Sequence, residues 1–330
     1  MISIEHKQLE NFTFIDLFAG IGGFHYALTS MGARCIFASE WDKNAADSYF
    51  RNFGIKPNGD ITLIKESEIP QHDILCAGFP CQAFSISGKQ RGFEDIRGTL
   101  FFEIARITKY HKPKVLFLEN VKNLARHDNG KTLKIIIQTL SELGYVVHNK
   151  VLNAAHYGLP QNRERIYIVA FRNDINSSEF TFPSASDKQV CLLDYLENNP
   201  DSAKVISRND IEIYKEYLPQ KSLFNEMILL NKPIQIGKVN KGGQGERIYH
   251  PLGHAITLSA HGGGIGAKTG LYLIEGKIRK LSPRECARIQ GFPEDFIIHE
   301  SSTQAYKQFG NSVSINVLQK ISIQIAGVLK

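Results

Sequence analysis

An apolar run that stops at a cluster of glycines most limits how this chain can fold. The run covers residues 14–18 and is followed directly by Ala19-Gly20-Ile21-Gly22-Gly23. Beyond the glycines, apolar side chains recur at positions i, i+4 and i+7, namely Phe24, Leu28 and Met31. This pattern predicts a strand, a tight turn and a helix, and the turn lets a ligand approach the backbone at the start of the helix.

A second apolar run, residues 35–39, ends at Glu40, where a carboxylate can accept hydrogen bonds from ribose hydroxyls. Glu40, Trp41 and the later Gly59-Asp60-Ile61 together favour an adenosine-type cofactor over a purely structural turn. The glycines do not follow the G-x-G-x-x-G order, so fewer backbone amides point at phosphate oxygens. A cofactor without a pyrophosphate is therefore favoured, and a nicotinamide oxidoreductase is disfavoured.

Two further strand-like runs, residues 73–77 and 114–118, lead to Cys81 and Glu119, with a helical segment between them. Alternating strands and helices indicate parallel βαβ units, whose strands present their carboxyl ends at one edge of the sheet. Because Cys81 follows the turn residue Pro80, we expect it to be a presented nucleophile with Glu119 as its neighbour. The predicted fold class is α/β.

Length and composition exclude several classes of protein. With 330 residues, of which 42% are hydrophobic, the chain can form one large domain or two unequal ones. Its five cysteines include no C-x-x-C pair, which argues against a disulfide framework and a zinc site. The first residues lack a signal-peptide pattern, and no apolar stretch approaches the ~20 residues that span a bilayer. We therefore expect a cytoplasmic protein with neither a metal nor a membrane partner.

Basic residues and glycines concentrate between residues 231 and 283. This stretch has eight Lys and Arg residues against two Glu residues, and it holds 11 of the chain's 27 glycines. Such a segment favours a nucleic-acid partner, although a flexible β-rich appendage with a solvated basic face has the same composition. The polar, glycine-containing loop at 85–99 is predicted to be a lid or binding element rather than a disordered connection.

Three domains or segments are expected from these changes along the chain. Residues 1–192 form a catalytic and cofactor-binding domain, and residues 193–283 form a recognition domain. Residues 284–330 return to the first domain, because Val317, Leu318, Ile321 and Ile325 make an apolar helical stripe.

Six motifs together resemble the DNA (cytosine-5) methyltransferases, in the order of that family. They are Asp16-Leu17-Phe18-Ala19-Gly20-Ile21-Gly22-Gly23, Gly78-Phe79-Pro80-Cys81-Gln82, Glu119-Asn120-Val121, Gln161-Asn162-Arg163-Glu164-Arg165, Arg284-Glu285-Cys286-Ala287-Arg288 and Gly310-Asn311-Ser312-Val313. The resemblance covers nearly the whole chain and is weakest at about 177–233. It implies a Rossmann-like sheet of an S-adenosylmethionine-dependent methyltransferase, with a smaller, mostly β and loop target-recognition domain.

The resemblance also implies a covalent mechanism. Cys81 would add to C6 of a flipped cytosine, Glu119 would hydrogen-bond N3, preferably in its protonated form, and Arg165 would hold O2 with Arg163 in support. From the residues themselves, two arginines at i and i+2 of a strand lie on one side, and a solvated edge is the alternative reading. No histidine lies in the motifs to deprotonate Cys81, which leaves the turn after Pro80 and nearby arginines to lower its pKa.

Cofactor and DNA contacts follow from the same matching of motifs. The implied cofactor-binding residues are Phe18, Ala19, Gly20, Gly22, Gly23, Glu40, Trp41, Asp60, Ile61, Pro80, Leu100, Asn311 and Val313. The implied DNA-binding residues are Ser85, Ser87, Lys89, Gln90, Arg97, Gln244, Arg247 and Thr257. His261 stands where the resemblance predicts a tyrosine, so one minor contact differs.

The resemblance further implies double-stranded DNA as substrate, GCGC as target with its inner cytosine modified, a monomeric enzyme, and a functional pairing with a restriction endonuclease. Two alternatives remain open from the sequence. A tRNA cytosine-5 methyltransferase would share the catalytic motifs, and a catalytically silent DNA-binding regulator would share the fold.

Overall fold

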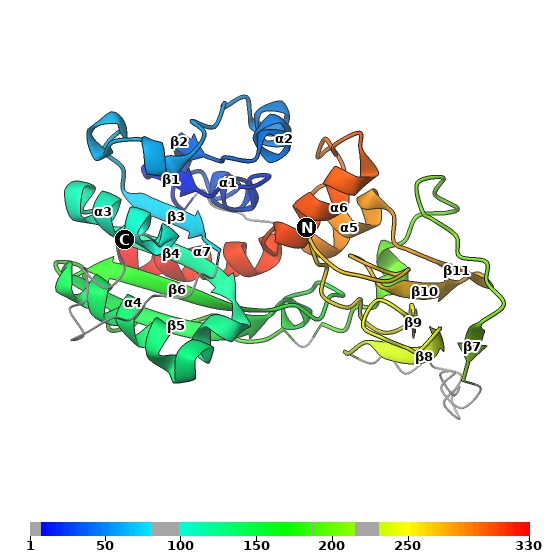
Figure 1. Cartoon of the computed structure of the whole chain (residues 1–330). Helices are drawn as coiled ribbons and strands as arrows, with labels where there is room; N and C mark the ends of the chain where they lie inside the picture. The colour runs from blue at the N-terminus through cyan, green and yellow to red at the C-terminus, as the bar shows by residue number, and fades with distance from the viewer. Residues whose placement is uncertain (1–7, 81–98, 187, 215–230) are drawn as a thin grey trace. The chain divides into compact units, whose positions relative to one another are not determined.

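The computed structural model describes residues 8–80, 99–186, 188–214 and 231–330. The chain divides into two compact units (Figure 1). Unit 1 comprises residues 1–152, 164–184 and 317–330, and unit 2 comprises residues 153–163 and 185–316.

Unit 1 is built on a six-stranded sheet in the order β2-β1-β3-β4-β6-β5. Its strands are β1 (Thr13–Leu17), β2 (Arg34–Ser39), β3 (Ile74–Gly78), β4 (Val115–Val121), β5 (Tyr145–Asn153) and β6 (Glu164–Arg172). Its helices are α1 (Gly23–Thr29), α2 (Lys43–Phe53), α3 (Leu100–His111), α4 (Lys131–Glu142) and most of α7 (Ile315–Leu329). Short 3-10 turns are η1 (Ile61–Leu63), η2 (Glu66–Glu68), η4 (Lys122–Ala125) and η5 (His127–Gly130). This is the predicted α/β class.

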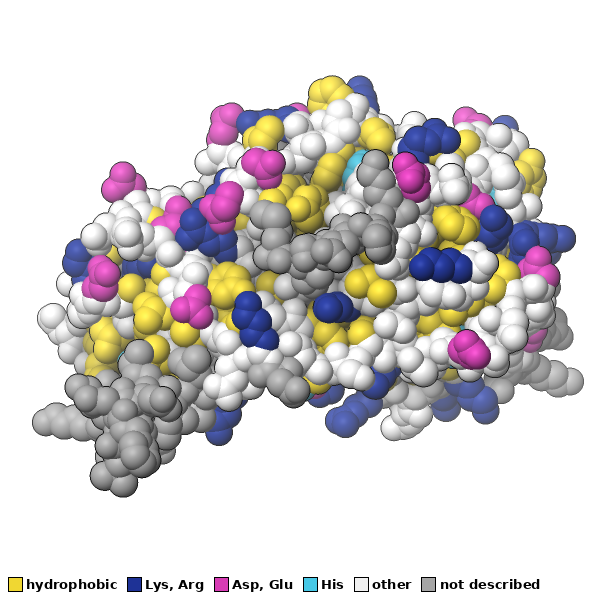
Figure 2. Space-filling model, turned by 180° about the vertical axis from the view of Figure 1, so that it is seen from behind, with side chains coloured by type: hydrophobic (Ala, Val, Ile, Leu, Met, Phe, Trp, Pro, Cys, Tyr) yellow, Lys and Arg dark blue, Asp and Glu magenta, His cyan; other side chains and the backbone are white. Residues whose placement is uncertain are grey.

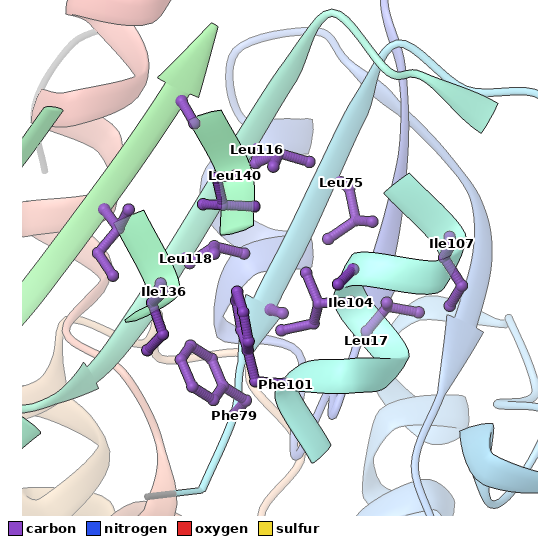
Figure 3. Packing of buried hydrophobic residues seen from close by; sticks show 14 of the residues in the cluster. Leu17, Leu75, Phe79, Phe101, Ile104, Ile107, Leu116, Leu118, Ile136 and Leu140 are labelled. Carbon is purple, nitrogen blue, oxygen red and sulfur yellow. The ribbon is translucent and has the colours of Figure 1, made fainter. Parts of the chain in front are cut away.

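The core of unit 1 explains why its central strands are almost entirely apolar. Leu75 and Leu116 on neighbouring strands belong to one buried cluster with Phe101 and Ile104 of α3 and Ile136 of α4 (Figure 3). These five side chains are at most 1% exposed. The strands of a parallel sheet that is covered on both faces are continuous apolar runs. These runs are the pattern from which the sequence analysis predicts the strands.

One strand of this sheet runs against the others. β1, β2, β3 and β4 pair in parallel, whereas β6 pairs with β4 antiparallel. The start of β6 therefore lies at the carboxyl end of β4, where Val121 is the register partner of Arg165. The prediction of parallel units was correct for β1 to β4 but not for β6.

Unit 2 contains a five-stranded sheet in the order β11-β10-β9-β8-β7. The strands are β7 (Ile211–Ile213), β8 (Ile234–Val239), β9 (Arg247–His250), β10 (Leu271–Ile274) and β11 (Lys277–Arg279), accompanied by η6 (Ala154–His156), η7 (Leu192–Tyr195), α5 (Pro283–Gln290) and α6 (Ser302–Asn311). A small apolar cluster that includes Ile236, Val239, Ile248 and Leu271 holds the sheet together.

The segment after β11 is shared between the two compact units. Residues 284–316 belong to unit 2 and Val317–Lys330 to unit 1. Helices α5 and α6 belong to unit 2, where a buried ion pair joins α5 to the end of β11. Glu285 of α5 forms a bidentate pair with Arg279, at 2.7 and 2.8 Å, and both side chains are at most 6% exposed.

The C-terminal helix is a core element of unit 1. Val317, Leu318, Ile321 and Ile325 are at most 1% exposed, as the apolar stripe predicted. The region Ser302–Leu329 is long and apolar enough to be a candidate membrane span, but 61% of its most apolar window is buried within the protein. Burial of that kind is typical of the core helix of a globular domain.

Two buried histidines of unit 1 predict a loss of stability in acid. Burial lowers the pKa of both His25 and His72 from 6.5 to about 4. His25 shares a 2.6 Å hydrogen bond with Tyr49, and His72 bonds the carbonyl of Pro70 at 2.8 Å. Because the unfolded chain binds these protons more tightly, the stabilisation is complete above pH 6.5 and is lost as the pH falls towards 4. Each histidine accounts for up to about 3 kcal/mol.

Urea denaturation between pH 7.5 and 4.5 measures this loss. The variant His72→Gln keeps an N–H donor for Pro70 but cannot be protonated, so its stability should fall less steeply with acid than that of the wild type. Identical profiles for the two proteins would contradict the assignment to His72.

Candidate active site

The glycine turn after β1 adopts a conformation that few other sequences allow. Phe18, Gly20 and Gly22 have positive φ angles of 55°, 56° and 85°. Gly22 caps α1, and a Cβ at this position would overlap the ring of Phe53, whose Cζ lies 2.8 Å away. Gly20, in contrast, is only partly buried and has no atom within 4 Å of an added Cβ, so the open side of the turn lies at this residue. Ala19 precedes it in the turn, and Gly23 begins α1.

Glu40 links the end of β2 to this turn. Its two carboxylate oxygens accept hydrogen bonds from the backbone N–H groups of Gly20, at 2.7 Å, and Asp42, at 2.8 Å. Burial raises the pKa of Glu40, and these backbone bonds oppose the shift. Each oxygen keeps a further lone pair, so the carboxylate can still accept hydrogen bonds from vicinal hydroxyls.

Two further predicted cofactor residues of unit 1, Asp60 and Ile61, follow a segment that is bonded to β2. Asn58 donates from its backbone to the carbonyl of Ala38 at 2.8 Å, which joins this segment to β2. Asp60 caps η1 by accepting from Thr62 at 2.9 Å, and Ile61 behind it is buried. Arg106 of α3, the helix that Leu100 begins, donates to the carbonyls of Ile61 and Ile64.

Trp41, in contrast, is 77% exposed beside Glu40. An indole left in solvent next to a buried carboxylate is available to stack on a flat ligand. Asn311 and Val313 belong to unit 2, where Asn311 is exposed and Val313 is buried.

A carboxylate and a guanidinium meet at the carboxyl edge of the sheet. Arg165 Nε lies 3.1 Å from Glu119 Oε1, and the two side chains are 14% and 9% exposed. Their meeting follows from the strand directions, because β6 begins where β4 ends. On its other side Glu119 is the register partner of Gly78, the last residue of β3, which leads through Phe79 to Pro80. The sequence prediction that Cys81 and Glu119 are neighbours stays a prediction, because Cys81 lies outside the described residues.

Asn120 fixes the segment ahead of Cys81, a role that the sequence reasoning did not identify. Its buried amide donates to the carbonyl of Phe79 at 2.8 Å and accepts from the N–H of Val121 at 2.8 Å. The only signal in the sequence was its position beside Glu119. The amide joins the ends of β3 and β4 and so defines the spacing of the two segments.

The cysteines that the structure describes are poorly suited to be nucleophiles. Cys35, Cys76, Cys191 and Cys286 are all buried, and burial raises the pKa of each thiol. A reactive cysteine needs an accessible thiolate, which these environments disfavour. Cys81 lies outside the described residues. The same is true of five predicted DNA-binding residues that follow it, Ser85, Ser87, Lys89, Gln90 and Arg97.

Arg163 has a different set of partners from Arg165. It is 2% exposed, and its guanidinium donates to the carbonyls of Leu258, at 3.0 Å, Gly310, at 3.1 Å, and Ser312. All of these partners belong to unit 2. The structure places Arg165 beside Glu119, and the supporting role of Arg163 in the catalytic site stays a prediction.

Several glycines of the predicted recognition segment are required by packing within the segment itself. A Cβ on Gly245 would overlap the carbonyl of Gly263, and Gly266 donates its N–H to the carbonyl of Gly245 at 2.7 Å. Two glycine-rich loops therefore pack backbone to backbone. Gln244, Arg247 and Thr257 remain exposed around them, so some glycines serve loop packing rather than approach to a partner.

The basic charge of this segment is also partly compensated. Arg279 is buried against Glu285, and Lys238 pairs with Glu212 at 3.1 Å. On the face drawn in Figure 2, Lys and Arg side chains are interspersed with Asp and Glu side chains. Within the described ranges, no group of three or more His, Cys, Asp or Glu side chains could hold a metal ion.

Comparisons with known proteins agree with this architecture. A model of the C-5 cytosine-specific DNA methylases matches residues 12–327. The chain is 57% identical over 332 residues to the type II methyltransferase M.HhaI of Haemophilus parahaemolyticus, covering 100% of this chain and 98% of the relative. It is 46% identical to M.HpaII of Haemophilus parainfluenzae, over 94% of this chain and 88% of the relative.

Solved structures at lower identity share the fold. The S. pombe Dnmt2 methyltransferase superposes with a TM-score of 0.67 at 20% identity, covering 96% of this chain and 98% of the other. The Entamoeba histolytica methyltransferase EhMeth superposes with a TM-score of 0.71 at 20% identity, covering 97% and 99%.

Proposed function

This chain belongs to the C-5 cytosine-specific DNA methylases, and we propose that it is the modification enzyme of a bacterial restriction-modification system. It transfers a methyl group from S-adenosylmethionine to C5 of cytosine in double-stranded DNA and protects that DNA from a cognate endonuclease. It acts as a monomer in the cytoplasm, without a metal.

The observation that carries the proposal is the Glu119–Arg165 pair at the carboxyl edge of the sheet. Cytosine presents N3 and O2 on one edge, and a carboxyl group beside a guanidinium offers matching partners for both. Gly78 pairs with Glu119 in register, and the proposal assigns Cys81, three residues further along the chain, to the same edge. The pair is only 14% and 9% exposed, so a cytosine must leave the base stack to reach it.

The chain's own residues supply a nucleophile and a means of stabilising charge. The Cys81 thiolate forms a bond to C6, and the ring electrons move towards N3, where Glu119 stabilises them by a hydrogen bond or a proton. C5 becomes enamine-like and can take up a methyl group. Loss of the C5 proton to a base and departure of the thiolate from C6 then restore the aromatic ring as 5-methylcytosine.

The residues around the glycine turn fit S-adenosylmethionine, which supplies an electrophilic methyl group when bound. Glu40 is held in place by two backbone amides yet keeps lone pairs for ribose hydroxyls. The absence of a Cβ at Gly20 leaves open space beside the backbone there. Phe18 would stack on the adenine, and the exposed indole of Trp41 would line the adenosine pocket. Asp60, Ile61 and Leu100 complete the proposed pocket.

Recognition is assigned to unit 2, through Gln244, Arg247 and Thr257. Arg247 would read a guanine edge in the major groove, and Gln244 would fill the space left by the flipped base together with Ser87. The proposed target is GCGC, with the inner cytosine modified.

Bisulfite sequencing of plasmid DNA treated with the protein and S-adenosylmethionine tests both the activity and the target. We expect protection from conversion at the inner cytosine of every GCGC site and background conversion elsewhere. A tRNA transcript incubated with labelled cofactor is the matched control and should stay unlabelled. Methylation at another sequence would overturn the target, and labelling of the tRNA alone would overturn the substrate.

A further inference from the structure

A single buried arginine connects two segments of unit 2 that are far apart in sequence. Arg163 donates to the carbonyl of Leu258 on one side and to the carbonyls of Gly310 and Ser312 on the other. Because a guanidinium is planar and rigid, one side chain that bonds both segments defines the distance between them.

The two segments are also in direct contact. Gly310 approaches the backbone of Ala260 so closely that a Cβ would lie 2.7 Å from Ala260 Cα and overlap the atoms before it. Small relative movements of the segments are therefore sterically linked. Closely packed interiors transmit such displacements rather than absorbing them.

Two buried glutamines hold the outer sides of the same segments. Gln161 accepts from the N–H of Leu258 at 3.2 Å and donates to Ile289 at 3.0 Å. Gln290 donates to the carbonyl of Phe309 at 2.8 Å and accepts from Ser314 at 3.1 Å. Both glutamines are fully buried, so the segments form one polar network in which Arg163 is the central connection.

We propose that Arg163 is a positioning residue that couples cofactor binding to DNA binding. The segment at 257–260 carries the proposed DNA contact Thr257, and the segment at 310–313 carries the proposed cofactor contacts Asn311 and Val313. A ligand that orders one segment orders the other through the guanidinium, so each ligand binds more tightly when the other is present. The inference rests on the proposed function, which assigns those contacts.

The variant Arg163→Lys tests this coupling. It keeps the charge but has a single ammonium group that cannot span all three carbonyls with the geometry of the fork. The measurement is the Kd of S-adenosylhomocysteine with and without a GCGC duplex, by calorimetry. In the wild type the duplex should tighten binding, and in the variant this enhancement should fall by roughly 10-fold, the effect of losing one charge-assisted hydrogen bond. The KM values for both substrates should rise, with kcat changed less.

Arg279→Lys is the matched control, because Arg279 is a second buried arginine of unit 2 whose pair with Glu285 touches neither segment. At comparable loss of thermal stability it should retain the coupling. If Arg163→Lys does not fold, Gln161→Met loosens the Leu258 side of the network and should also weaken the coupling. The inference is wrong if the wild type shows no coupling, if the Arg163 or Gln161 variant keeps it, or if Arg279→Lys loses it equally. A wild type that methylates no duplex would instead refute the proposed function.

Discussion

Replacement of Cys81 by serine should lower methyl transfer to duplex DNA by roughly 10⁴-fold or more. The nucleophile in the proposed mechanism is a thiolate, and a serine hydroxyl is almost fully protonated at neutral pH and adds poorly to C6. The volume of the side chain hardly changes, so DNA and cofactor binding should persist. Transfer of labelled methyl groups measures the loss, and a gel-shift titration on the same preparation checks that DNA is still bound.

Covalent trapping makes the prediction specific for this residue. With 5-fluorocytosine at the target position, C5 carries no proton to remove, so the adduct at C6 should survive denaturing electrophoresis when cofactor is present. The wild type and the control Cys76→Ala, which alters a buried thiol on β3, should both form the adduct. Cys81→Ser should not. Methyl transfer by Cys81→Ser at a rate near that of the wild type would show that the covalent mechanism is wrong.

The sequence predicted most of the catalytic sheet because buried parallel strands are short apolar runs bounded by turn residues. The expected strands at 73–77 and 114–118 correspond to β3 and β4 within one to three residues at each end. The sequence assigns the glycine turn and Glu40 to one cofactor site. The structure joins them by a 2.7 Å bond from the N–H of Gly20 to Glu40, and the ribose contact of Glu40 stays a prediction. In each instance the determining interactions are local or between adjacent strands.

Structural features that depend on residues far apart in the sequence could not be predicted in this way. β6 has the composition of any buried strand, so its antiparallel direction could not be seen, although it is what brings Arg165 to Glu119. Arg163 and Arg165 look equivalent in the sequence, yet the partners of Arg163 lie 95 to 149 residues further along the chain. The assignment of α5 to unit 2 depends likewise on the buried pair of Arg279 with Glu285.

Gly310→Ala should destabilise the protein by about 3 kcal/mol or more, although alanine is the better helix former. Gly310 lies in the last turn of α6, where the added methyl group would overlap the backbone N of Ala260 and the carbonyl carbon of Ser259. Both are backbone atoms, so no side-chain rotation can relieve the overlap. Either the 257–260 segment or the end of α6 must move, and a shift of either segment strains the Arg163 bonds.

Gly327→Ala provides the matched control, since this residue is an exposed helical glycine of α7 with no atom within 4 Å of an added Cβ. It should gain about 0.5–1 kcal/mol from helix propensity alone. Urea denaturation of the two variants beside the wild type separates a steric effect from a general effect of glycine replacement. Because the same backbone contact underlies the proposed coupling, wild-type stability in Gly310→Ala would mean that the segments are not in contact in solution. The coupling assigned to Arg163 would then lose its steric component and rest on the carbonyl bonds alone.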